Sequence, residues 1–181
     1  MKKLILSAAA LFAFGFANAQ EAKTTTGGGG QTAEGKWLIE ANTGFGGAHS
    51  ADTSFGLNSV DGETTWKIGA EGGYFVIDRL AIKAGVGFAD NGGDGPGSSS
   101  FSYKAGVKYY IKDMIPVQVD YSGASIKDAD ENPSYIGLQA GYAIFLGENV
   151  SIEPGIKYNL SMNSDFYEDV FQVRVGFALH F

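Results

Sequence analysis

The last eleven residues alternate in polarity without a fault, and this pattern restricts the fold more than any other feature of the chain. From Phe171 to Phe181, every odd position is apolar and every even position is polar or small. Because successive side chains of a β-strand point to opposite faces, the segment is predicted to be a half-buried strand. Its length matches the roughly 9–11 residues with which a strand of a transmembrane barrel crosses a bilayer.

Seven earlier segments show the same two-residue period. The eight predicted strands are Lys36–Gly46, Thr64–Ile77, Arg79–Ala89, Ser100–Lys112, Met114–Gly123, Ser134–Leu146, Asn149–Met162 and Phe166–Phe181. One phase is apolar in all eight, so they are expected to form one sheet surface. An even number of antiparallel strands can close, which removes the edges that lipid does not tolerate. The predicted fold is all-β, an eight-stranded antiparallel up-and-down transmembrane β-barrel, closed by pairing of the last strand with the strand that holds Trp37.

The connections between these segments alternate in length. Tight turns are predicted at Ile77–Arg79, Lys112–Met114 and Gly147–Asn149, as in hairpins. The other connections are Gly47–Glu63, Asp90–Ser99 and Ala124–Pro133, rich in turn-forming residues, and a short fourth at Asn163–Asp165. We call the two rims the short-turn end and the long-loop end. Such asymmetry is typical of outer-membrane barrels.

The N-terminal region has the pattern of an exported protein. Lys2 and Lys3 precede an apolar stretch that runs from Leu4 to Phe16, and the small-x-small triplet at 17–19 fits a cleavage site. Residues 1–19 are therefore predicted to be a signal peptide. Residues 20–35, rich in Gly and Thr, are expected to be a flexible leader, and residues 36–181 the barrel domain.

Composition excludes several classes of function. The chain has no cysteine, which removes disulfides, thiolate metal sites, a cysteine nucleophile and a lipid-bearing cysteine anchor. Its formal charge of −7 becomes −9 when Lys2 and Lys3 leave with the signal peptide. Acidity of this degree argues against a nucleic-acid partner.

Alternation alone does not say whether the apolar face points inward or outward. A secreted, lipocalin-like barrel points it inward around a ligand, whereas a membrane barrel points it outward to lipid. The polar face favours the membrane barrel, because it mixes long charged side chains with many glycines, as a narrow interior requires. We therefore predict an interior network of six cations and four anions that neutralise one another: Glu40, Lys67, Glu71, Lys83, Lys104, Lys108, Asp120, Glu153, Lys157 and Arg174.

Aromatic residues support this orientation, because they concentrate near the two predicted rims. Those expected near the short-turn end are Trp37, Tyr74, Tyr109 and Phe181. Those expected near the long-loop end are Phe45, Trp66, Phe88, Phe101, Tyr121, Tyr158 and Tyr167. Two such belts around an aliphatic middle are typical of a barrel in a bilayer.

With eight strands, a signal peptide and a terminal aromatic strand, residues 36–181 resemble the small eight-stranded outer-membrane β-barrel family, which includes outer-membrane proteins A and X. The resemblance implies the outer membrane of a Gram-negative bacterium and insertion by the barrel assembly machinery. It also implies that this machinery reads a signal in the last strand, formed by Val173, Val175, Phe177, Leu179 and Phe181. It does not imply one function, because small barrels serve many roles.

The sequence offers few parts for an enzyme. Some barrels of this shape modify lipid with His, Ser and a carboxylate, and the candidates here are His49, Ser50 and Asp52 in the first loop. A solvated loop is the simpler interpretation, so no catalytic residue is assigned. The segment Asp90–Gly95 partly imitates a calcium loop, but Gly92 and Phe101 stand where ligands are required, and a glycine-rich turn explains it better. No cofactor or metal site is predicted.

Acidic residues dominate the long-loop end, where Lys127 is the only base. The predicted rim acids are Asp52, Asp61, Glu63, Asp90, Asp94, Asp128, Asp130, Glu131, Asp165, Glu168 and Asp169. Divalent cations could link such a rim to lipopolysaccharide or to an anionic partner, although a merely hydrated surface explains it equally well. Since the interior of an eight-stranded barrel is filled by side chains, we expect no pore. The predicted function is that of a monomeric outer-membrane barrel with a structural or surface-interaction role; a lipid-modifying enzyme and a secreted ligand carrier are the alternatives.

Overall fold

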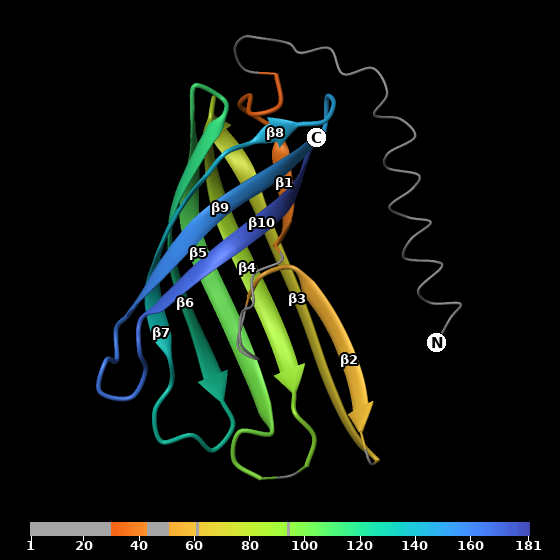
Figure 1. The fold of residues 1–181 in the computed structure, drawn as a ribbon, viewed down its shortest axis with the longest axis vertical. Coiled ribbons are helices and arrows are strands. Elements are labelled where there is room, and N and C mark those ends of the chain that lie inside the picture. Colours follow the sequence, from red (N-terminus) through yellow and green to blue (C-terminus); the bar gives the residue numbers. More distant parts are fainter. Residues whose placement is uncertain (1–29, 43–50, 61, 94) are drawn as a thin grey trace.

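The chain folds into a closed antiparallel β-barrel (Figure 1). The computed structural model describes residues 30–42, 51–60, 62–93 and 95–181. Its strands are β1 (Trp37–Asn42), β2 (Ser54–Val60), β3 (Glu63–Ile77), β4 (Leu80–Asp90), β5 (Ser99–Ile111), β6 (Ile115–Ile126), β7 (Ser134–Gly141), β8 (Ile144–Phe145), β9 (Val150–Ser161) and β10 (Val170–His180). The predicted all-β, antiparallel barrel fold is confirmed. The predicted signal peptide lies outside the described residues.

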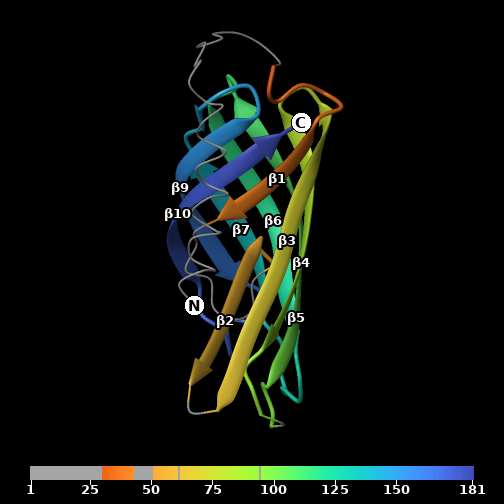
Figure 2. The ribbon, with the colours of Figure 1, turned by 90° about the vertical axis from the view of Figure 1, so that its right-hand side faces the viewer.

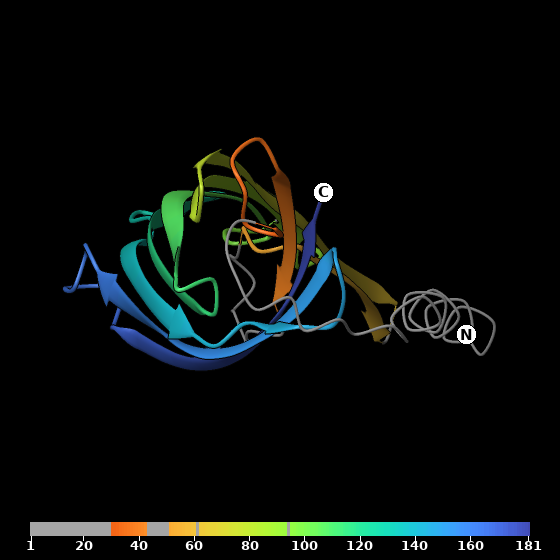
Figure 3. The ribbon, with the colours of Figure 1, turned by 90° about the horizontal axis from the view of Figure 1, so that it is seen from above.

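Ten strand segments make eight positions in the barrel wall. β1 and β2 both pair with β3, one beyond the other, so they share one position (Figure 2). β7 and β8 likewise both pair with β9. Viewed from the short-turn end, the strands surround a common axis (Figure 3).

The first and last strands close the ring, as the alternation of the terminal segment predicts. β1 pairs antiparallel with β10, with Leu38 opposite His180 and Asn42 opposite Gly176. Beyond this ladder, the backbone of Trp37 exchanges two hydrogen bonds with Phe181, with N···O distances of 2.6 and 3.0 Å. The terminal residue therefore takes part in closure through its backbone.

The three tight turns lie where the sequence predicts them. Lys112 and Asp113, between β5 and β6, both have positive φ, at 51° and 61°. Two successive left-handed residues characterise the type I′ turns whose twist matches that of a hairpin. Arg79, between β3 and β4, also has positive φ.

β2 corrects the sequence analysis, which assigned residues 47–63 to a loop. Ser54–Val60 pairs with β3, with Phe55 opposite Ile68 and Leu57 opposite Trp66. Phe55 and Leu57 are two residues apart, and an Asp61-Gly62 dipeptide of the kind that favours hairpin turns follows them. This weak signal was outweighed by the Gly, Ser and Asn around it.

Residues 30–35, at the end of the predicted leader, form hydrogen bonds with the barrel that the sequence analysis does not anticipate. The Thr32 carbonyl accepts from the Arg79 N–H at 2.7 Å, and the Glu34 N–H donates to Asp78 Oδ1 at 2.9 Å. Thr32 Oγ1 donates to Asp113 Oδ1 at 3.0 Å, and Gln31 Nε2 donates to the Gly147 carbonyl at 2.6 Å. These residues contact all three tight turns and lie across the short-turn end.

The barrel wall is continuous at the short-turn end and less complete at the long-loop end. There, β2 pairs with β3 alone, and residues 170–175 of β10 pair with β9 alone, among the residues that the structure describes. β2 and β10 diverge towards the long loops (Figure 1). The predicted continuation of the first strand, residues 43–46, falls outside the described part of the chain.

Candidate functional site in the charged barrel interior

Strand alternation decides which side chains face the interior. In β4, burial alternates residue by residue, so that Ala81, Lys83 and Ala89 are buried while Ile82 and Phe88 are exposed. The same rule in the other strands places nine of the ten predicted network residues inside: Glu40, Glu71, Lys83, Lys104, Lys108, Asp120, Glu153, Lys157 and Arg174 are all buried. Lys67 differs, because it is exposed near the long-loop end.

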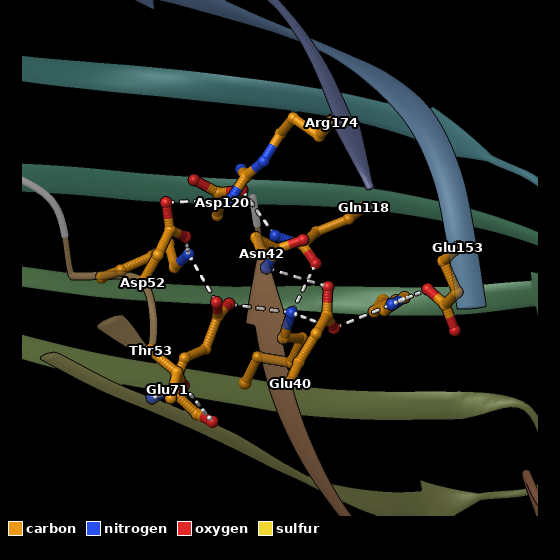
Figure 4. A network of polar contacts seen from close by, with 12 residues as sticks. Glu40, Asn42, Asp52, Thr53, Glu71, Gln118, Asp120, Glu153 and Arg174 are labelled. Carbon is orange, nitrogen blue, oxygen red and sulfur yellow. Dashed lines mark hydrogen bonds and ion pairs between the residues drawn. The ribbon is translucent and has the colours of Figure 1, made fainter. Parts of the chain in front are cut away.

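Glu40, on β1, lies at the centre of the network (Figure 4). Its Oε2 atom accepts from Lys83 Nζ and from Lys108 Nζ, both at 2.8 Å. Lys108 also pairs with Glu153 on β9. Because one carboxylate joins cations from β4 and β5, the network ties together strands that are far apart in sequence.

Glu71, on β3, continues the network towards the long-loop end. Its Oε1 atom lies 2.8 Å from Lys83 Nζ, and its Oε2 atom lies 2.9 Å from Lys104 Nζ. Lys104 also pairs with Asp52. The ammonium groups of Lys83, Lys104 and Lys108 therefore each contact two carboxylates, which compensates the cost of burying a charge.

Asp52 corrects the prediction that it belongs to the acidic rim. Asp52, two residues before β2, lies inside the barrel, where its Oδ2 atom is 2.9 Å from Arg174 Nη2 and its side chain is 16% exposed. Thr53 beside it accepts from the Glu71 N–H at 2.8 Å. The interior network therefore includes Asp52 and excludes Lys67. It contains five cations and five anions, where six cations and four anions were predicted, so its formal charges cancel.

Gln118 and Asp120, on β6, link Lys83 to Lys157. Gln118 accepts from Lys83 Nζ at 2.8 Å and donates to Asp120 Oδ2 at 2.7 Å, and Lys157 Nζ donates to Asp120 Oδ1 at 2.8 Å. A Cβ atom on Gly137 would lie 2.5 Å from Lys157 Cε and 2.6 Å from Asp120 Oδ1. Glycine at 137 is therefore what leaves room for this ion pair.

An apolar layer, absent from the sequence analysis, fills the interior at the short-turn end. Leu38, Phe75 and Tyr110 are fully buried there, with Ala81, Ala143 and Ala178 beside them. The Tyr110 hydroxyl donates to Glu153 Oε1 at 2.7 Å and so joins the layer to the network. The sequence does contain a signal for this layer, because its large residues occupy the polar phase of their strands near the strand ends.

His180 connects this layer to residues 30–35. Its Nε2 atom lies 3.1 Å from Ser151 Oγ, and its Nδ1 atom lies 3.1 Å from the carbonyl oxygen of Gln31. Since a carbonyl oxygen only accepts, Nδ1 carries the hydrogen in this contact. Ser151 and His180 are both completely buried, so the geometry assigns this pair to packing and leaves no approach for a substrate.

The long loops contact one another through backbone and side-chain hydrogen bonds. The Gly97 N–H donates to the Lys127 carbonyl at 2.7 Å, which joins the β4–β5 and β6–β7 loops. Asn163 Nδ2 donates to Glu131 Oε2 at 3.1 Å, which joins the β6–β7 and β9–β10 loops. The Ser161 N–H and the Tyr158 hydroxyl donate to Asp169, and these bonds lower the pKa of its carboxyl group.

The predicted rim acids are mostly exposed, as expected for loop residues, but they do not gather into a compact site. No group of three or more His, Asp or Glu residues that could hold a metal ion occurs among the described residues. Asp90 Oδ1 accepts from the Gly92 N–H at 2.9 Å, and Gly92 and Gly93 have positive φ, as in a glycine-rich turn. Asp61 and Asp94 lie outside the described residues, as do His49 and Ser50.

The exterior of the barrel is apolar and aromatic. Trp37 and Tyr74 pack at the short-turn end with ring centroids 5.1 Å apart. Phe88 and Phe101 pack 4.9 Å apart nearer the long-loop end. The five residues of the predicted assembly signal lie on the outward face of β10 and just after it; Phe177, Leu179 and Phe181 are exposed, as is Val173, whereas Val175 is half-buried.

The described part of the chain contains no helix long and apolar enough to cross a membrane. No protein-family model and no curated protein matches the sequence. Three solved structures that resemble the chain are a de novo designed transmembrane β-barrel, the N-terminal barrel domain of OprF from Pseudomonas aeruginosa, and neisserial surface protein A.

The designed barrel is 14% identical to the chain, with a TM-score of 0.46, and the match covers 83% of this chain and 99% of that one. The OprF domain is 13% identical, with a TM-score of 0.46, and the match covers 82% of this chain and 98% of that domain. Neisserial surface protein A is 15% identical, with a TM-score of 0.46, and the match covers 82% of this chain and 100% of that one. The chain is similar to these barrels over most of its length. Its own strand order defines a closed antiparallel β-barrel with eight wall positions.

Proposed function

We propose that the chain is an integral outer-membrane β-barrel protein with a structural or surface-interaction role. The observation that carries this proposal is the inverted distribution of side chains. Lys83 is 2% exposed inside the barrel, while Ile82 and Leu138 on the outside are 54% and 46% exposed. Soluble monomers rarely expose a contiguous apolar surface of this extent, whereas lipid stabilises it. The aromatic belts would then lie at the two interfaces of the bilayer.

Cell fractionation and an SDS gel of unheated and boiled samples test this proposal. A folded membrane barrel stays in the outer membrane and changes its mobility on boiling. The alternative of a secreted, lipocalin-like carrier predicts a soluble protein in the periplasm or the medium, and that outcome would refute the membrane location. Because this experiment needs no knowledge of a partner, it comes before any functional assay.

We further propose that the interior is closed to solutes. Support comes from the five cations and five anions that pair across the interior, and from the layer formed by Leu38, Phe75 and Tyr110. An eight-stranded barrel leaves an interior only wide enough for side chains to fill. Purified protein in planar bilayers should therefore give no porin-like conductance, and a stable large channel would overturn this part of the proposal.

The acidic long-loop end is proposed to face the cell exterior and to associate with lipopolysaccharide through divalent cations. Exposed Asp128, Asp130 and Glu131 on one loop support this idea, because such charges repel one another unless cations screen them. Chelation should lower both barrel stability and lipopolysaccharide association. If neither changes, the rim is a hydrated surface and the cation link is wrong.

For assembly, the proposed partner is the barrel assembly machinery, which would read the last strand. Two variants separate recognition from closure, because Phe181 bonds to Trp37 through its backbone while its ring is 55% exposed. Phe181→Ala keeps the backbone bonds and should lower insertion in cells but not the stability of the refolded barrel. Deletion of Phe181 should lower both. Normal insertion of Phe181→Ala would argue against recognition of the ring.

A catalytic role is not proposed. Asp52, the described member of the candidate trio, is held in ion pairs with Lys104 and Arg174. Replacement of His49 by alanine provides the test: the lipid species of the outer membrane should be the same in the variant and the parent. A lipid modification that depends on His49 would favour the enzyme instead.

A further inference from the structure

We infer that the inner face of the β2–β3 hairpin holds an acidic or phosphorylated sugar unit, with Lys67 as the residue that contacts its anionic group. The inference deepens the proposed surface-interaction role and rests on it, because it takes the long-loop end to face outward. Among the ten residues predicted for the interior network, Lys67 is the one that lies outside it.

Lys67 lies beside a hollow of about 240 Å³ between the hairpin and the end of β4. The residues that line it and bear on ligand chemistry are Gly56, Asn58, Thr65, Lys67, Asp90 and Asn91. The hollow is smaller than the roughly 300–1,000 Å³ typical of sites for drug-sized ligands. Its size therefore suits a single small polar unit.

The Lys67 side chain lies over Gly56, its opposite residue in the β2–β3 ladder. A Cβ atom on Gly56 would lie 3.2 Å from both Cγ and Cε of Lys67. The lysine stem therefore rests on the glycine backbone, across β2. Glycine at 56 removes the side chain that would otherwise push the lysine away from the hollow.

Lys67 differs in its ion pairing from the other five cations that the sequence assigns to the interior. Lys83, Lys104 and Lys108 each contact two carboxylates, whereas Lys67 forms no ion pair with any residue that the structure describes. Without a carboxylate partner among the described residues, the Lys67 ammonium is available to pair with an external anion by direct contact. A carboxylate or a phosphate supplies that anion.

The other groups in the hollow favour a sugar over a bare anion. Asn58 and Thr65 offer an amide and a hydroxyl on the same face of the hairpin as Lys67, because residues two apart on a strand share a face. Asn91 adds a second amide from the end of β4, and its Nδ2 atom is already bonded to the Gly97 carbonyl at 3.1 Å. Amides and hydroxyls that converge beside one cation match a hydroxyl-rich ligand with one negative group.

The location agrees with such a ligand. Trp66 pairs with Asp90 at the end of β4. This pair lies two residues further along the strands, towards the long loops, than the pair formed by Ile68 and Phe88 on the outer apolar surface. In the proposed orientation, this is where the lipid chains end and the sugar and phosphate groups of the outer leaflet begin. The same chemistry occurs in free extracellular polysaccharide, and the experiment must separate these two sources.

The test uses the purified full-length barrel in detergent and saturation-transfer NMR with glucose 6-phosphate, galacturonate, glucose and inorganic phosphate. We expect saturable binding of the two anionic sugars, and binding of glucose and of phosphate at least about tenfold weaker. Lys67→Gln should abolish the signal, and Gly56→Ala should weaken it with the charge retained. Lys127→Gln, which removes an exposed base on the β6–β7 loop, is the matched control and should bind like the parent.

Each other outcome overturns the inference. Equal binding of inorganic phosphate would mean that the sugar plays no part, and equal binding by Lys67→Gln would mean that the lysine is not the contact. Vesicles that contain lipopolysaccharide, compared with its released oligosaccharide, then identify the source. All variants should keep heat-modifiable mobility in the outer membrane; a soluble protein would refute the proposed function, whereas a correctly inserted barrel without sugar binding refutes only this inference.

Discussion

Phe75 and Phe55 show how differently the two ends of the barrel are built. Phe75, near the short-turn end of β3, is completely buried among Leu38, Tyr110 and the alanines of the apolar layer. Phe55, on β2 towards the long-loop end, is 75% exposed. The short-turn end is a closed ring with a packed interior, whereas the long-loop end has a strand, β2, with one partner strand in the described part of the chain.

The difference separates stability from recognition. Packing, tight turns and the hydrogen bonds of residues 30–35 hold the short-turn end, so substitutions there are expected to affect unfolding. The long-loop end carries exposed polar groups on loops and on a hairpin, which is where binding surfaces occur when a rigid scaffold supports them. Three pairs of substitutions and one pH titration test this contrast.

The largest effect is expected from a matched pair of aromatic substitutions. Phe75→Ala should lower the free energy of unfolding by about 4 kcal/mol, because it leaves a cavity in a closed layer. Phe55→Ala should cost less than about half as much, since its ring is mostly outside. Urea unfolding in lipid vesicles, followed by gel mobility, measures both. Equal losses would mean that the two ends are equally packed.

A second pair compares charges inside and outside the network. Glu40→Gln should cost about 3 kcal/mol, because Lys83 and Lys108 each lose a buried counter-charge while keeping a second one. Lys67→Gln should change stability by less than about 0.5 kcal/mol, because the side chain is exposed. The same unfolding assay applies. A large loss of stability in Lys67→Gln would mean that Lys67 belongs to the interior network.

A third pair tests residues 30–35. Thr32 is 1% exposed and donates to Asp113, so Thr32→Val should cost about 1 kcal/mol. Thr64→Val, which removes a weak exposed contact of 3.4 Å to Ser59, should be neutral. Hydrogen exchange of the Arg79 amide, which donates to the Thr32 carbonyl, gives a local measurement. Unchanged protection of Arg79 in Thr32→Val would mean that the leader docks through its backbone alone.

The smallest effect is a pH response confined to the long-loop end. Hydrogen bonds from the Ser161 N–H and the Tyr158 hydroxyl lower the pKa of Asp169. A carboxyl whose pKa is lowered by folding stabilises the loop above its unfolded pKa of about 3.9 and loses that contribution as pH falls through the folded pKa. The NMR signal of the Ser161 amide should therefore shift only below about pH 3.9, and Asp169→Asn should abolish the shift.

Much of this fold could be predicted from the sequence, because strand alternation is a local property. The pairing of β1 with β10, the three tight turns and the burial of nine charged residues all follow from the position of each residue within a strand. The predicted excess of cations over anions in the interior was itself a sign that one assignment was incomplete. Sequence could not supply the missing residue, because Asp52 lies outside any alternating segment and reaches Lys104 and Arg174 only through the closed barrel.

The number of wall positions, their order along the chain and the polar face of each strand could thus be predicted from the sequence alone. Each of these depends on residues two apart, whose relation the geometry of a strand fixes. Only the tertiary structure decided that Asp52 enters the interior, that Lys67 stays outside it, that β2 pairs with β3, and that residues 30–35 cross the short-turn end. These features depend on contacts between segments distant in sequence, and such contacts exist only once barrel closure has brought the segments together.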